Sequence, residues 1–133
     1  MDLTTLAVVG IIALAALFDF TNGFHDSANS IATVVATHVL KPKVAVVWAA
    51  GWNFLAFFLI GTAVADTVGE TVKAQYYSVA VVFAALLAAV IWNFLSWHFG
   101  IPTSSSHALI GGLVGAALIK GGIEAIKASS VEK

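Results

Sequence analysis

The sequence predicts an all-α membrane protein with broken transmembrane helices. Its 133 residues are 60% hydrophobic and only 10% charged, and their mean hydropathy is +0.98. A water-soluble domain carries roughly 25–35% charged residues on its surface, which this chain cannot supply. Two apolar stretches, 3–40 and 74–119, are also longer than one bilayer crossing requires. We therefore expect residues 1–133 to form a single transmembrane region.

One segment has the form of a simple transmembrane helix, whereas two longer stretches require interruption. Val44–Ala65 lacks charged residues and is long enough to cross about 30 Å of hydrocarbon. As straight helices, stretches 3–40 and 74–119 would reach about 57 and 69 Å, so each is expected to break. Thr21-Asn22-Gly23 marks the first break because these residues weaken helical backbone bonding. Phe99–Thr103, which contains a glycine and a proline, marks the second.

The predicted elements are a broken helix (about 3–39), a span (44–65), a long apolar helix (about 77–100) and a short helix (about 104–119). The short helix either crosses the bilayer or turns back as a re-entrant hairpin. Within it, Gly111 and Gly115 have the four-residue spacing that lets another backbone approach closely. Polar residues follow both breaks, and non-helical backbone in a bilayer needs cover from protein or water. We therefore expect one internal site between half-helices.

The first polar cluster forms a stripe along one helical face, and its central residue is Asp26. Steps of three and four residues place the members together: Asp19, Asn22, Asp26, Asn29, Thr33 and Thr37. Carboxylate, amide and hydroxyl oxygens suit a hard cation or a proton. An acid at membrane depth costs roughly 2.5–3.5 kcal/mol, which favours a functional role for Asp26. The alternative is hydrogen bonding between helices, which suits Thr33 and Thr37 equally well.

The second polar cluster is the run Thr103-Ser104-Ser105-Ser106, which precedes a helix rich in small residues. Four hydroxyls beside the unpaired N–H groups of a helix N-terminus form an anion site that needs no arginine. The alternative is a simple N-cap, which explains one hydroxyl but not the other three. His107 follows the run, and His25 and Asn93 are further candidates for the polar site.

Composition excludes several classes of function. Without cysteine, the chain forms neither disulfides nor thiolate metal sites, and we predict no resident metal or other cofactor. Six scattered lysines and a net charge of −1 provide no basic face, so nucleic acid is not an expected partner. An intramembrane hydrolase built from Ser104–Ser106, His107 and Asp26 is disfavoured. Ser106 and His107 are adjacent on a helix and do not face each other.

Two motifs resemble signatures of the inorganic phosphate transporter (PiT) family. Phe20–Ser30 (FTNGFHDSANS) is similar to the signature G-A-N-D-x-A-N-[SA], and Gly100–Gly112 (GIPTSSSHALIGG) to P-[VT]-S-[TS]-[TS]-H-A-[IL]-x-G. Members of this family carry two inverted repeats, each with both motifs. The chain resembles the first repeat only, so the expected partner is a second repeat or another copy of the chain.

The resemblance implies cation-coupled symport of inorganic phosphate by a multi-pass protein of the cell (inner or plasma) membrane rather than enzyme activity. It implies phosphate binding by Thr103, Ser104, Ser105, Ser106 and Asn29, and binding of the coupling cation or proton by Asp26, Asn22, His25 and Asp19. His25 replaces the first Asn of the usual signature, as in the bacterial low-affinity branch associated with proton coupling and with divalent-metal phosphate. The coupling ion, Na⁺ or a proton, stays open.

Two alternatives to phosphate symport remain. Sulfate or another oxyanion would also fit hydroxyls and a helix N-terminus, although an acceptor such as Asp26 favours phosphate, which carries a proton at neutral pH. The chain could instead be an inert structural half or fragment. Measuring phosphate uptake by the reconstituted chain would distinguish a working transporter from an inert half.

Overall fold

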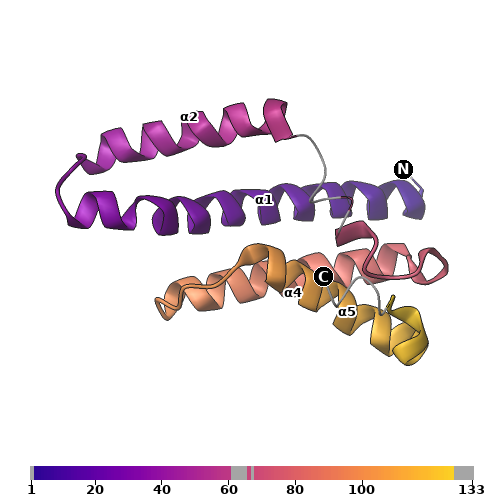
Figure 1. The fold of residues 1–133 in the computed structure, drawn as a ribbon. Coiled ribbons are helices and arrows are strands. Elements are labelled where there is room, and N and C mark those ends of the chain that lie inside the picture. The colour runs from indigo at the N-terminus through magenta and orange to yellow at the C-terminus, as the bar shows by residue number, and fades with distance from the viewer. Residues whose placement is uncertain (1, 61–65, 67, 128–133) are drawn as a thin grey trace.

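The computed structural model describes residues 2–60, 66 and 68–127. Their elements are α1 (Leu3–Ala36), α2 (Pro42–Ile60), α4 (Val79–His98) and α5 (Ser105–Gly121), with short 3₁₀ turns η1 (Ala74–Tyr76) and η2 (Gly122–Ala125) (Figure 1). The regular secondary structure of the described part is helical apart from an isolated antiparallel bridge between Val72 and Ile126. Within these described ranges, four helical segments are long and apolar enough to cross a membrane, which confirms the all-α membrane class.

Helix α1 is continuous, so the predicted break at Thr21-Asn22-Gly23 is wrong. The Thr21 hydroxyl donates to the Phe18 carbonyl within the same helix at 2.9 Å, so it does not compete with the backbone ladder. Gly23 lies in helical backbone, where glycine costs only about 1 kcal/mol relative to alanine. A break would leave backbone groups unpaired in an apolar medium, at several kcal/mol each. The larger penalty keeps the helix intact.

The second predicted break is confirmed between α4 and α5. Gly100 has a φ of +64°, its N–H donates to the Trp97 carbonyl at 3.1 Å, and the Ile101 N–H donates to the Ser96 carbonyl at 2.8 Å. This pair of bonds is a Schellman motif, which glycine favours because it tolerates the left-handed region. Pro102 follows and cannot continue the helix. Helices α4 and α5 match the predicted 77–100 and 104–119 within two residues at each end.

Helix α4 lies at the centre of the packing, against α5 on one side and α1 on another. One apolar cluster joins α4 and α5 with the segments that follow α2 and α5; its buried members are Val72, Val81, Ala85, Leu113, Ala117 and Ala125. A second cluster joins α1 to α4 through Phe18, Leu86, Ala89 and Val90.

Gly112 makes the close backbone contact with α4, whereas Gly111 and Gly115 have open space, so the predicted role of the Gly111–Gly115 pair is wrong.

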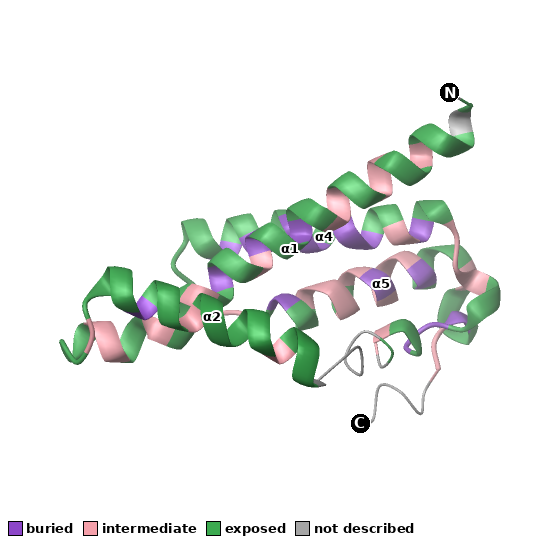
Figure 2. Ribbon diagram, turned by 90° about the horizontal axis from the view of Figure 1, so that it is seen from above, coloured by how far each residue is buried: buried purple, intermediate pink, exposed green. Residues whose placement is uncertain are grey.

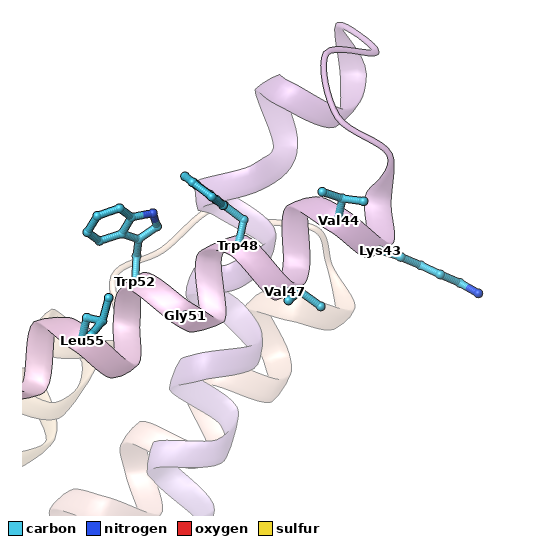
Figure 3. A pocket seen from close by; sticks show the side chains of 7 residues that line it. All are labelled: Lys43, Val44, Val47, Trp48, Gly51, Trp52 and Leu55. Carbon is cyan, nitrogen blue, oxygen red and sulfur yellow. The ribbon is translucent and has the colours of Figure 1, made fainter.

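Helix α2 lies against α1, on the side of α1 away from α4 and α5 (Figure 1). Most of α2 is exposed (Figure 2), and it accounts for residues 44–60 of the predicted span 44–65; residues 61–65 lie outside the described residues. A shallow groove of about 590 Å³ runs along its outer face (Figure 3), lined by Lys43, Val44, Val47, Trp48, Gly51, Trp52 and Leu55. This groove contains none of the predicted site residues.

Candidate functional site

The polar residues of α1 divide between two neighbouring faces of the helix. Thr21 and His25 are buried against α4, and they follow Phe18 at steps of three and four residues. The predicted stripe is displaced by one position along the chain and therefore lies on the neighbouring face of α1. There Asp19, Asp26 and Asn29 are exposed, and Asn22 is half-buried. One face of α1 therefore holds the helices together, and the adjacent face presents the carboxylates and amides.

The first polar link between α1 and α4 joins Thr21 to Asn93. The Thr21 hydroxyl uses its only hydrogen on the Phe18 carbonyl, so Thr21 Oγ1 accepts from Asn93 Nδ2 at 3.3 Å. This orientation leaves Asn93 Oδ1, in a side chain that is 1% exposed, without a partner among the described residues. A buried unpaired acceptor is costly and fits a water molecule or a cation.

The second link passes through Ser96, which sequence reasoning did not identify. Ser96 Oγ lies 3.2 Å from His25 Nε2 and accepts from Thr103 Oγ1 at 3.1 Å. It thereby joins α1, α4 and the residue that opens the hydroxyl run. Ser96 stands three residues after Asn93 in an otherwise apolar helix, and that spacing of polar residues is the signal that could have identified it.

The hydroxyl run supplies an N-cap and two further serines with different environments. Ser104 caps α5 by accepting from the His107 N–H at 3.4 Å. Ser105 is buried, at 1% exposure, and its Oγ lacks a partner within the described part of the chain. Ser106 is exposed. The simple-cap alternative therefore accounts for Ser104 alone.

A cavity of about 590 Å³ brings the two polar clusters together. Asp19 and Asn22 of α1 line it, and Ser106 of α5 lines it from the other side. Tyr77 contributes to its wall and donates a hydrogen bond to the Gly69 carbonyl at 2.8 Å. A carboxylate, an amide and a hydroxyl that converge on a mostly apolar wall can orient and bind a small ion.

The other predicted residues line two further cavities beside α4. His25 and Asn29 face a cavity of about 310 Å³ together with Ser96. Thr103, Ser104 and His107 line another of about 620 Å³. Asp26 is exposed on α1, and Ser105 is enclosed between helices. The predicted site residues therefore lie near one another on α1 and at the start of α5, but they are divided among separate cavities and do not surround a single ligand position.

The side chain of Thr37 bonds within its own helix rather than to a neighbouring helix. The Thr37 hydroxyl donates to the Thr33 carbonyl at 2.7 Å, and both residues are exposed. Among the described residues, no group of three or more His, Cys, Asp or Glu side chains could hold a metal ion. The chemistry available is therefore that of hydroxyls, amides, one buried imidazole and two carboxylates on α1.

Comparison with known proteins identifies relatives over most of the chain. A family model described as the phosphate transporter family matches residues 22–133. A probable low-affinity inorganic phosphate transporter of Rhizobium meliloti is 56% identical over 120 residues, covering 90% of this chain and 36% of the relative. A probable low-affinity inorganic phosphate transporter of Bacillus subtilis is 44% identical over 129 residues, covering 95% of this chain and 38% of the relative.

The low-affinity inorganic phosphate transporter PitA of Escherichia coli is 40% identical over 126 residues, which cover 89% of this chain and 25% of the relative. The chain therefore spans only about a quarter to two-fifths of the length of these three relatives. No solved structure matches it.

Proposed function

The chain belongs to the phosphate transporter family, and from this premise we propose that it takes part in cation-coupled symport of inorganic phosphate across the cell membrane. Its membership of a family of transporters, not of enzymes, and its four long apolar helices identify it as a multi-pass membrane protein. The named relatives support phosphate as the substrate. We further propose that the chain acts as the first of two inverted repeats, completed by a second repeat or by another copy.

The observation that carries this proposal is the cavity shared by Asp19, Asn22 and Ser106. It brings the carboxylate-bearing face of α1 to the first turn of α5, where unpaired N–H groups and hydroxyls favour an anion. We assign phosphate to Thr103, Ser104, Ser105 and Ser106 with Asn29. We assign the coupling ion to Asp26, Asn22, His25 and Asp19.

Electrostatics explains why such a site would couple two ions. Two like charges 4 Å apart repel by about 4 kcal/mol at an effective dielectric constant of 20. A phosphate beside Asp19 or Asp26 therefore needs a compensating positive charge, which Na⁺ or a proton on the carboxylate supplies. A divalent cation bound to the phosphate would have the same effect, and the substrate would then be a metal–phosphate complex. The exposed positions of Asp26 and Asn29 support a site completed by further protein.

Reconstitution of the 133-residue chain tests the proposal. The chain is placed in liposomes, and uptake of radiolabelled phosphate is measured under an inward proton gradient, an inward Na⁺ gradient or neither, each with and without Mg²⁺. Empty liposomes provide the background. We expect uptake above background that depends on one gradient and is inhibited by arsenate more strongly than by sulfate.

Three results would contradict parts of the proposal. Equal inhibition by sulfate would favour a general oxyanion permease. Uptake independent of both gradients would remove the coupling. No uptake under any condition, with the chain folded and inserted, would favour a structural half without activity of its own.

A further inference from the structure

A single serine hydroxyl connects the imidazole on α1 with the first residue of the hydroxyl run. Ser96 Oγ contacts His25 Nε2 at 3.2 Å and Thr103 Oγ1 at 3.1 Å, and both Ser96 and His25 are buried. We propose that Ser96 is a positioning residue that sets the direction of both hydrogen bonds and thereby favours an oxyanion that carries a proton. The preference for the oxyanion rests on the proposed phosphate transport; the hydrogen-bond directions do not.

The direction of each bond follows from the hydrogens available. A serine hydroxyl has one hydrogen and two lone pairs. Ser96 Oγ lies 2.8 Å from the Trp92 carbonyl and 3.2 Å from the Asn93 carbonyl, and a carbonyl oxygen can only accept. The Ser96 hydrogen is therefore committed to its own helix. Both remaining contacts of Ser96 must then be accepted bonds.

The first consequence concerns His25. Because Ser96 accepts, Nε2 of His25 must carry a hydrogen, so the neutral imidazole is the Nε2–H tautomer and any further proton binds at Nδ1. The other residues that line the same cavity are uncharged, so no neighbouring charge there competes for this arrangement: Ala28, Asn29, Ser96, Trp97, Gly100, Ile101 and Pro102. Ser96 thus determines which nitrogen of His25 can exchange a proton.

The second consequence concerns Thr103. Its hydroxyl hydrogen is donated to Ser96, so towards any ligand in the cavity that it shares with Ser104 and His107, Thr103 Oγ1 can only accept. An acceptor is satisfied by the P–O–H group of hydrogen phosphate but not by sulfate, which has no proton at neutral pH. Thr103 is half-buried, and an acceptor that a bound anion covers without pairing is costly, so this direction disfavours sulfate. Ser96 therefore acts on substrate choice without touching the substrate.

The test combines nitrogen NMR of the histidines with anion competition. ¹⁵N-imidazole spectra of the detergent-solubilised chain are recorded for wild type, Ser96→Ala and Ser96→Thr, and the His25→Gln variant assigns the His25 signals. Phosphate binding is titrated calorimetrically in the same samples, with and without sulfate. Ser30→Ala is the matched control, because the exposed Ser30 hydroxyl donates only to the Ser27 carbonyl of its own helix.

We expect neutral His25 in the wild type to be the Nε2–H tautomer. Ser96→Ala should give a mixture of tautomers and reduce the preference for phosphate over sulfate roughly fivefold to tenfold, the effect of one hydrogen bond. Ser96→Thr, which keeps the hydroxyl, and Ser30→Ala should retain both properties. Thr103→Val should reduce the preference by a similar factor, and adding Ser96→Ala to it should reduce it little further.

A wild-type His25 in the Nδ1–H tautomer overturns the proposal, and this result needs no variant to fold. An unchanged tautomer in folded Ser96→Ala, or a variant that weakens phosphate and sulfate binding equally, overturns it as well. These outcomes are distinct from failure of the proposed function. If the wild-type chain takes up no phosphate, the transport proposal fails for this chain. The tautomer of His25 still tests the role of Ser96 in that case.

Discussion

A side-chain carbon at Gly112 of α5 would lie 2.7 Å from the carbonyl oxygen of Ala85 in α4. Real Cβ atoms do not approach a backbone oxygen so closely, so the two helices can pack at their present distance only with glycine at this position. The contact sets the spacing between α4 and α5 about two helical turns after the hydroxyl run.

We predict that Gly112→Ala destabilises the fold by about 1–3 kcal/mol, because the added methyl group meets backbone rather than a flexible side chain. The measurement is thermal unfolding in detergent, followed by circular dichroism. Gly115→Ala is the control, since it adds the same methyl group to the same helix where nothing lies within 4 Å. That variant should be neutral or slightly stabilised because alanine is the better helix former. Equal melting temperatures for the two variants would contradict the packing argument.

The turn between α4 and α5 could be predicted from the sequence because its signals are local. Gly100 and Pro102 act within a few residues of their own positions, and the helix bounds followed from them. The predicted break in α1 failed for a different reason. Relative to alanine, Gly23 weakens a helix by about 1 kcal/mol and Asn22 by at most about 0.7 kcal/mol, which is less than the cost of unpaired backbone groups in an apolar medium.

The polar site could be predicted in its residues but not in its connections. Helical spacing placed Asp19, Asn22, Asp26 and Asn29 on one face, yet spacing does not say which neighbouring helix that face meets. Contacts such as His25 with Ser96 join residues that are 71 positions apart, and they depend on the packing of α1 on α4. The sequence signal for Ser96 is its three-residue spacing from Asn93, and without knowledge of the packing this spacing does not distinguish it from an ordinary buried serine.

Tyr77 should make the stability of the chain depend on alkaline pH. Burial raises the pKa of Tyr77, and its hydroxyl donates to the Gly69 carbonyl. A raised folded pKa means that this stabilisation is complete below the unfolded value of about 10 and is lost as the pH rises through the folded value. Tyr77→Phe should lower stability by about 1 kcal/mol near pH 8 and show a smaller further loss above pH 10.

The measurement for Tyr77 is the melting temperature in detergent between pH 8 and 11. Tyr76→Phe is the control, because it removes the hydroxyl of the only other tyrosine in the chain. The lysines, which titrate in the same pH range, are identical in both variants. A wild type and a Tyr77→Phe variant with parallel pH profiles would show that the hydroxyl of Tyr77 does not contribute in this range.

Asp26→Asn is expected to abolish coupled uptake while leaving membrane insertion intact. The substitution keeps the shape of the side chain and removes a charge that costs roughly 2.5–3.5 kcal/mol at membrane depth, so insertion should improve slightly. Phosphate uptake in liposomes and protease protection of the inserted chain measure the two effects separately. Glu124→Gln, which neutralises an exposed acid in η2, should change neither. Unchanged uptake and gradient dependence in Asp26→Asn would show that Asp26 takes no part in the coupling.

Replacing Ser104, Ser105 and Ser106 together with alanine should raise the KM for phosphate strongly. Each hydrogen bond to a charged ligand contributes roughly 1.5–3 kcal/mol, so the loss of even one corresponds to a tenfold or larger change. Backbone N–H groups at the start of α5 remain, so some affinity should persist. Arsenate, which shares the shape and protonation of phosphate, should lose potency as an inhibitor in parallel.

Loss of the α5 cap must be separated from loss of phosphate contacts in this triple variant. Ser104 accepts from the His107 N–H, and removing an N-cap costs about 1 kcal/mol of stability. Ser78→Ala is the matched control, because Ser78 caps α4 by accepting from the Val81 N–H at the same 3.4 Å. It should lose similar stability and keep its affinity for phosphate. If the triple variant also keeps wild-type affinity, the hydroxyl run serves only to begin α5, and the anion must bind elsewhere.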